Sequence, residues 1–113
     1  MSRAPQMNRR LVLESAQRVS DGAGGYREEW GALGQVWAEV TGRSGRDTAR
    51  AGQSVSKTQH KITLRAAPMG QPDRPAPQQR FRDGARIYAI QSVFEADTMG
   101  RFLICLVEEE VST

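Results

Sequence analysis

The side chains with the clearest chemical potential in this sequence are cations gathered in its middle. Between positions 43 and 65 there are six basic residues and one acid, Asp47. Cations on a polar segment contact phosphate oxygens without reading base sequence, and no aromatic residue is interleaved here for base stacking. The alternative is a solvent-exposed loop whose arginines only keep it soluble. The candidates for contact with DNA are Arg43, Arg46, Arg50 and Lys57.

The remaining reactive side chains form no catalytic constellation. The only histidine, His60, is assigned to the polar face of the strand predicted at "HKITLR", where we expect a solvated imidazole. The only cysteine, Cys105, lies in the apolar run "FLICLV" and is expected to be a small buried hydrophobe. One cysteine and one histidine exclude an intramolecular disulfide and a Cys- or His-based metal cluster. The glycines of "DGAGG" lack the spacing of a P-loop. We predict no enzyme, no metal and no cofactor.

Length and composition predict one domain over residues 1–113, because most domains run to about 100 to 150 residues. A net charge of +3 is too weak by itself to indicate a nucleic-acid-binding protein. No apolar run approaches the roughly 20 residues of a membrane span, and the N-terminus lacks the apolar core of a secretory signal. We therefore expect a soluble cytoplasmic protein with no membrane partner.

The elements that position the cations are predicted to be strands, because apolar residues alternate with a period of two along much of the chain. A helix is disfavoured between the tryptophans by Gly31 and Gly34. Two reversals are predicted, one at Asp21-Gly22 in "DGAGGY" and one at Asp83-Gly84, which suits a tight hairpin. The expected strands lie in "RRLVLESAQRVSD", "GQVWAEVTG" and "KTQHKITLRA", about Phe81, through Ile87 to Ser92, and after Gly100.

Five or six short strands without a long helix predict an all-β fold, a small antiparallel β-barrel or sandwich. Residues 43–56 contain almost no large apolar side chain, so we expect one long, flexible, basic loop there. Residues 68–79 are rich in proline and are expected to form an irregular connection. Among the aromatic residues, Trp30, Trp37 and Tyr88 are candidates for the core or for anchors at a subunit contact, and we favour the core.

The order of these elements resembles the tailed-phage head-tail joining proteins, also called head closure, stopper or head-tail adaptor proteins. The matching features are Asp21-Gly22 and Gly25 ahead of Trp30, "VWAEV", "ITLR" and "DGARIYAI". The resemblance covers nearly the whole chain and depends on the order and spacing of these motifs.

The resemblance implies a structural virion protein, assembled in the host cytoplasm, that forms a homo-oligomeric ring at the head-tail junction. Such a ring contacts the portal or adaptor on the head side and a tail-terminator or tail protein on the other, and it seals or gates the channel for packaged DNA. Related proteins occur in phages, prophages and gene transfer agents. Two other readings stay open, a tail-terminator-type ring protein and an OB-like nucleic-acid-binding module.

Overall fold

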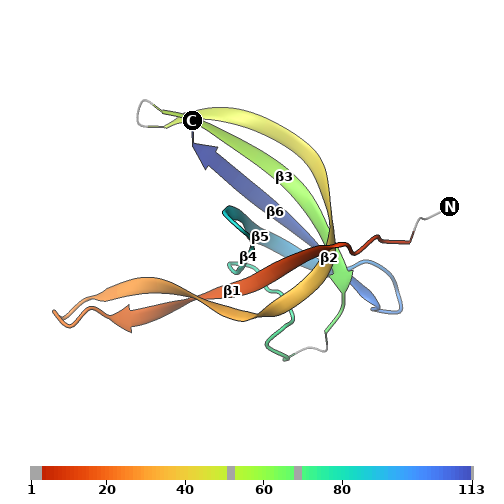
Figure 1. The fold of residues 1–113 in the computed structure, drawn as a ribbon, viewed down its shortest axis with the longest axis horizontal. Coiled ribbons are helices and arrows are strands. Elements are labelled where there is room, and N and C mark those ends of the chain that lie inside the picture. The colour runs from red at the N-terminus through yellow and green to blue at the C-terminus, as the bar shows by residue number, and fades with distance from the viewer. Residues whose placement is uncertain (1–3, 51–52, 68–69, 113) are drawn as a thin grey trace.

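The described residues form a six-stranded antiparallel sheet that closes on itself (Figure 1). The computed structural model describes residues 4–50, 53–67 and 70–112, and it describes their side chains except at 43–50, 53–56 and 111–112. The strand order is β1-β2-β3-β6-β5-β4, and pairing between β1 and β4 closes the barrel. The all-β antiparallel prediction is thus confirmed. The strands are β1 (Arg9–Ser20), β2 (Tyr26–Arg50), β3 (Gln53–Arg65), β4 (Arg80–Asp83), β5 (Arg86–Glu95) and β6 (Phe102–Ser112).

The core consists of the inward-facing residues of all six strands. On β6, for example, Leu103, Cys105 and Val107 are buried and alternate with more exposed neighbours. This period of two is what a strand with one buried face requires. The core residues are Leu11, Leu13, Ala38, Ile62, Leu64, Phe81, Tyr88, Ile90, Leu103, Cys105 and Val107.

Strand β2 is about twice as long as its neighbour β1, so it extends past the barrel at both ends. Its first residues pair only with β1, and we call residues 15–20 and 26–31 with their connecting turn the ribbon. Its last residues pair with β3, and we call residues 43–50 and 53–56 the wing. Figure 1 shows the ribbon projecting at the left and the wing curving away at the top.

Each projecting hairpin leaves the barrel at an irregularity in strand pairing. The register of β1 against β2 shifts between Leu13 and Glu14, and that of β2 against β3 shifts between Gly42 and Ser44. Such bulges bend a strand and increase its local twist. They therefore explain how one continuous strand serves the barrel wall and both projections.

The wing differs from our prediction of a loop over residues 43–56. Its backbone continues the barrel strands, with paired positions from Ser44 and Gln59 outward to Arg50 and Gln53. Strand β6 supports β3 as far as Val55, which pairs with Ser112. Backbone pairing replaces the apolar burial that the segment lacks. Composition alone did not reveal this source of order, because a ladder of hydrogen bonds needs no particular side chain.

The connections agree more closely with the sequence. Between β3 and β4 the described residues form only turns and irregular structure, as the prolines predict, although 68–69 fall outside the described part. The carboxylate of Asp21 accepts hydrogen bonds from the amides of Ala23 and Gly25, which shapes the ribbon turn. Gly84 has a φ of 61° between β4 and β5, a conformation that glycine adopts without strain. The described residues contain no helix of the length and apolarity that crossing a membrane requires.

Candidate functional site

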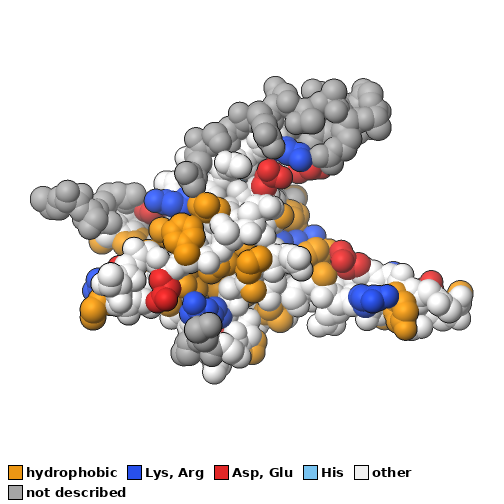
Figure 2. Space-filling model, turned by 180° about the vertical axis from the view of Figure 1, so that it is seen from behind, with side chains coloured by type: hydrophobic (Ala, Val, Ile, Leu, Met, Phe, Trp, Pro, Cys, Tyr) orange, Lys and Arg blue, Asp and Glu red, His pale blue; other side chains and the backbone are white. Residues whose placement is uncertain are grey.

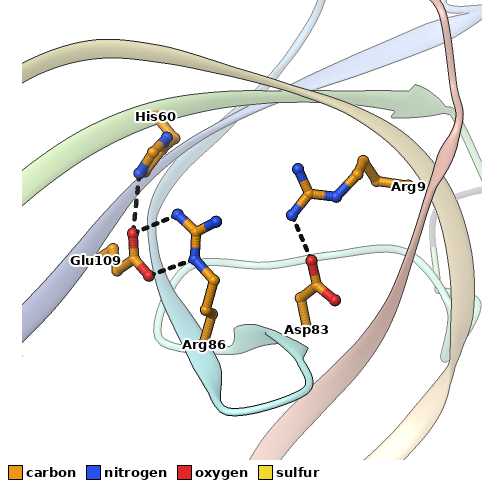
Figure 3. Close-up of polar contacts among 5 residues, drawn as sticks. All are labelled: Arg9, His60, Asp83, Arg86 and Glu109. Atoms are coloured by element: carbon orange, nitrogen blue, oxygen red, sulfur yellow. Dashed lines mark hydrogen bonds and ion pairs between the residues drawn. The ribbon is translucent and has the colours of Figure 1, made fainter.

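A layer of charged side chains lies at one end of the barrel, on the inward faces of five strands. Figure 3 shows two groups there, His60 with Glu109 and Arg86, and Arg9 with Asp83. The carboxylate of Glu109 accepts hydrogen bonds from Nε and Nη2 of Arg86, at 2.8 and 2.9 Å, and lies 3.2 Å from Nε2 of His60. We call these three residues the wing cluster, because His60 and Glu109 lie on β3 and β6 near the start of the wing.

Burial and charge make the wing cluster a rigid structural contact. Glu109 and His60 are 7% and 8% exposed, so neither is the solvated strand side chain that a polar sequence suggests. The hydrogen bonds from Arg86 lower the pKa of Glu109, and those same bonds raise the pKa of Arg86. A bidentate pair between guanidinium and carboxylate is both strong and geometrically specific. The cluster therefore holds β3, β5 and β6 together where the wing begins.

A second buried carboxylate lies at the base of the ribbon. Glu14 lies on β1 beside the bulge that Leu33 makes in β2, and it accepts hydrogen bonds from Nε of Arg80 at 2.7 Å and Nε of Arg82 at 2.8 Å. Burial raises the pKa of Glu14, but the bonds from the two arginines outweigh burial and lower it overall. Arg80 also stacks on the ring of Trp30, with 4.0 Å between its guanidinium carbon and the ring centroid. We call Glu14, Arg80 and Arg82 the ribbon cluster.

We predicted neither cluster from the sequence, although strand alternation indicates the buried positions in the wing cluster. His60 has the same strand parity as Ile62 and Leu64, and Glu109 has the same parity as Val107. The period of two therefore places both polar residues inside, which corrects our assignment of His60 to the polar face. For Glu14 parity points away from the core, because it alternates with the buried Leu13. Its burial comes from Arg80 and Arg82 of the neighbouring strand β4, which bond to its carboxylate.

The candidate cations for DNA contact divide into two groups. The backbone of Arg43, Arg46 and Arg50 lies in the part of β2 that forms the wing, and their side chains fall outside the described ones. Lys57 lies closer to the barrel, and its Nζ is 3.9 Å from a carboxylate oxygen of Glu108 and 4.0 Å from one of Glu110. The basic strand β3 thus pairs with the acidic end of β6, and this neutralises part of the positive charge that the sequence displays.

The three candidate aromatic residues have different environments. Tyr88 is fully buried, and its ring packs edge-on against His60 with 5.2 Å between the centroids. Trp30 is partly buried beneath Arg80. Trp37 is 57% exposed on the outside of the barrel, which corrects our preference for a core position. Its neighbours Val36 and Ala38 pack against the core instead. A role for Trp37 at a subunit contact stays a prediction.

Cys105 fits the sequence interpretation. It is buried in the core, and burial raises the pKa of its thiol to about 12. A thiol with such a pKa stays protonated at neutral pH, and the thiolate is the form that acts as nucleophile. Cys105 therefore packs as a hydrophobic side chain.

Comparisons with known proteins identify the family. Residues 2–110 match the model for phage head completion protein. A solved structure described as the virion of a native gene transfer agent particle contains a chain that is similar to this one, with 51% identity and a TM-score of 0.85. The similarity covers 96% of this chain and 98% of that chain. A comparison with curated proteins gave no match. Because the family match spans nearly the whole length, the chain belongs to the phage head completion protein family.

Proposed function

We propose that this chain is a non-enzymatic virion protein that forms a ring at the head-tail junction. The family places it among proteins that complete the phage head, and the similar chain is part of a gene transfer agent virion. In this role the barrel connects the portal or adaptor ring to a tail or tail-terminator protein. The ribbon and the wing extend from opposite ends of β2, which suits a subunit that contacts neighbours on one side and the channel on another.

The observation that carries the proposal is the wing. From Gly42 to Arg50 the strand advances roughly 25 Å at about 3.3 Å per residue, so the arginine-bearing end stands well away from the barrel. Strand pairing and the wing cluster make it a stiff projection. A stiff projection suits a channel seal better than a free loop, because less ordering entropy is lost when it contacts DNA or a neighbouring wing.

Ring symmetry would strengthen the contact between the arginines of the wing and DNA. Three cations on one chain are a weak phosphate site, and the charge of Lys57 is already engaged by Glu108 and Glu110. Copies that converge on one axis add their fields, and each phosphate that they neutralise releases counterions. Contact with DNA in this arrangement is independent of sequence and weakens as salt rises.

Truncation of the wing tests the sealing role. Residues 46–57 are replaced by Asn-Gly, which suits a two-residue hairpin, so that the paired residues Gly45 and Thr58 become the last rung. Particles that incorporate the shortened chain are expected to lose nuclease-protected DNA. A matched variant changes Arg43, Arg46 and Arg50 to glutamine and keeps the wing. Its DNA loss is expected to exceed that of wild type at low salt and to depend less on salt, because neutral side chains release no counterions.

Two results would contradict the proposal. Full retention of DNA by particles that contain the truncated chain at wild-type amount excludes sealing by the wing. Electron microscopy of assembled particles gives the second test, because density for the barrel is expected between the portal and the tail. Density for the barrel on the capsid surface away from this axis would exclude the junction role.

A further inference from the structure

Within the described chain, no further strand pairs with the two strands of the ribbon. Residues 15–20 pair only with residues 26–31, and the adjoining strands β4 and β3 begin to pair at Glu14 and Ala38 respectively. Two-stranded ribbons are marginally stable alone, and both outer edges here present unpaired backbone groups. Figure 2 shows the ribbon from behind, standing clear of the body at the right. Such an element suits contact with another chain.

A groove suited to an interface lies beside the exposed Trp37. It has a volume of about 340 Å³ and is lined by Met7, Val36, Trp37, Leu64 and Arg65. Trp37 is largely exposed there, and Arg10 lies opposite it in the pairing of β1 with β2. Tryptophan and arginine are the residue types most enriched where binding energy concentrates in interfaces.

The charges of the ribbon and the groove are complementary. The ribbon and its turn carry three acids and two arginines, Asp21, Glu28, Glu29, Arg18 and Arg27, so their net charge is −1. Nη2 of Arg27 forms an ion pair with the carboxylate of Glu29 at 2.9 Å, and the guanidinium of Arg18 lies over the ring of Tyr26. The turn amides lower the pKa of Asp21, which keeps its carboxylate ionised near the tip. At the groove, Arg10 and Arg65 are exposed cations.

The ribbon and the groove of one chain cannot meet. Both lie on β2, and from Gly24 at the tip to Trp37 the strand extends roughly 40 Å at about 3.3 Å per residue. The ribbon cluster also fixes the base of the ribbon, through hydrogen bonds from Arg80 and Arg82 to Glu14. A contact between ribbon and groove therefore joins two chains.

We propose that the ribbon of one copy docks in the Trp37 groove of the next copy. The two surfaces differ, so the contact is head-to-tail, and a head-to-tail contact that closes produces a ring. This inference rests on the proposed function, because it supplies the subunit contact of that ring. It assigns the ribbon to neighbouring subunits and leaves the wing to the channel.

Paired cysteines in assembled particles test this contact. Ala23 at the ribbon tip and Met7 at the groove are both changed to cysteine, and particles are treated with a short bis-maleimide that tolerates small errors in register. The native thiol of Cys105 is buried and protonated, so only the introduced thiols react. The expected product is a ladder at multiples of the 12.5 kDa chain.

The matched control pairs Ala23→Cys with Ala85→Cys, which lies in the exposed turn between β4 and β5 and outside the groove lining. Each single variant and this control are expected to give no ladder. In the Ala23→Cys, Met7→Cys chain, adding Trp37→Ala should reduce the ladder about tenfold or more, as truncation of a central anchor does.

Three outcomes would overturn the docking proposal: no ladder from the Ala23→Cys, Met7→Cys chain, an equal ladder from the Ala85→Cys control, or products whose mass includes another virion protein. These outcomes are distinct from failure of the proposed function. Particles that leak DNA after wing truncation but give no ladder would retain the sealing role and exclude this contact. A ladder in particles whose barrel lies away from the junction would retain the contact between ribbon and groove and exclude the junction role.

Discussion

Replacing Glu109 with glutamine removes one charge from the wing cluster and keeps the shape of the side chain. The side chain of Glu109 is 9% exposed, and its carboxylate accepts two hydrogen bonds from Arg86 and contacts His60. Glutamine offers one acceptor oxygen in place of two, and it turns an NH₂ group toward a donor. At least one donor in a confined site then loses its partner.

The expected loss of folding free energy is about 2 to 3 kcal/mol. Breaking a buried ion pair by removing one partner costs about 3 to 5 kcal/mol. The side chain of Arg86 is 49% exposed, so water can solvate its guanidinium after the change, and the expected loss lies below that range. A loss of this size should lower the melting temperature by roughly 10 °C in a chain of this length.

The pH dependence separates charge from packing. The folded-state pKa of Glu109 is lowered, so its ionised form stabilises the protein above its ordinary pKa, near 4.3. That stabilisation is lost as pH falls through the lower folded-state pKa. The difference in unfolding free energy between wild type and Glu109→Gln is therefore largest near pH 7 and shrinks below about pH 4.

Denaturant unfolding of both chains from pH 7 down to pH 3 measures this difference. The control is Glu110→Gln, which should cost less than about 1 kcal/mol, because the side chain of Glu110 is 45% exposed and its carboxylate lies 4.0 Å from Nζ of Lys57. Equal stability of wild type and Glu109→Gln at pH 7 would refute the reasoning. So would a difference that stays constant with pH, because the loss would then come from packing alone.

Three further predictions follow from burial and backbone geometry. Trp37→Ala should change the unfolding free energy of the isolated chain by less than about 0.5 kcal/mol in denaturant titrations. Phe81→Ala in the core should cost about 3 to 5 kcal/mol in the same assay. A large loss at Trp37 would contradict its surface position. Cys105 should resist maleimide in the native protein and react in denaturant, and rapid native labelling would contradict its burial. Gly84→Ala should cost about 1 kcal/mol in thermal unfolding, because φ at this residue is 61°. Gly34→Ala should cost less, because the added Cβ would make only an ordinary van der Waals contact with Asp73. The reverse order would contradict the turn geometry.

The sequence predicts the parts of the fold that depend on side-chain alternation and turn chemistry. Leu11 and Leu13, Ile62 and Leu64, and the Asp83-Gly84 turn lie where period and propensity indicate. The alternation along β6 also predicts that Glu109 faces inward. However, a run of three adjacent glutamates is typical of a solvent-exposed segment. The buried position of Glu109 depends on Arg86, which lies on another strand, and a pairing of this kind is set by the closed barrel.

The wing is the clearest case in which composition and structure differ. A segment without large apolar residues cannot repay its ordering entropy by burial, and composition therefore predicts a loop. Continuing the barrel ladder supplies hydrogen bonds instead, from β2 on one side of β3 and β6 on the other. The entropy cost of ordering the wing is reduced because its strands continue β2 and β3, which the core already holds in place.

The two clusters explain how a small barrel holds two projections at fixed directions. A bulge interrupts the ladder at the base of each hairpin, and an interrupted ladder is a natural position for a bend. At each base a buried carboxylate binds arginines from the β4–β5 hairpin, with Arg80 and Arg82 at Glu14 and Arg86 at Glu109. The shortest strand, β4, and its partner β5 thus brace both projections. In the ring that we propose, this bracing keeps the ribbon and the wing in one relative orientation in every copy.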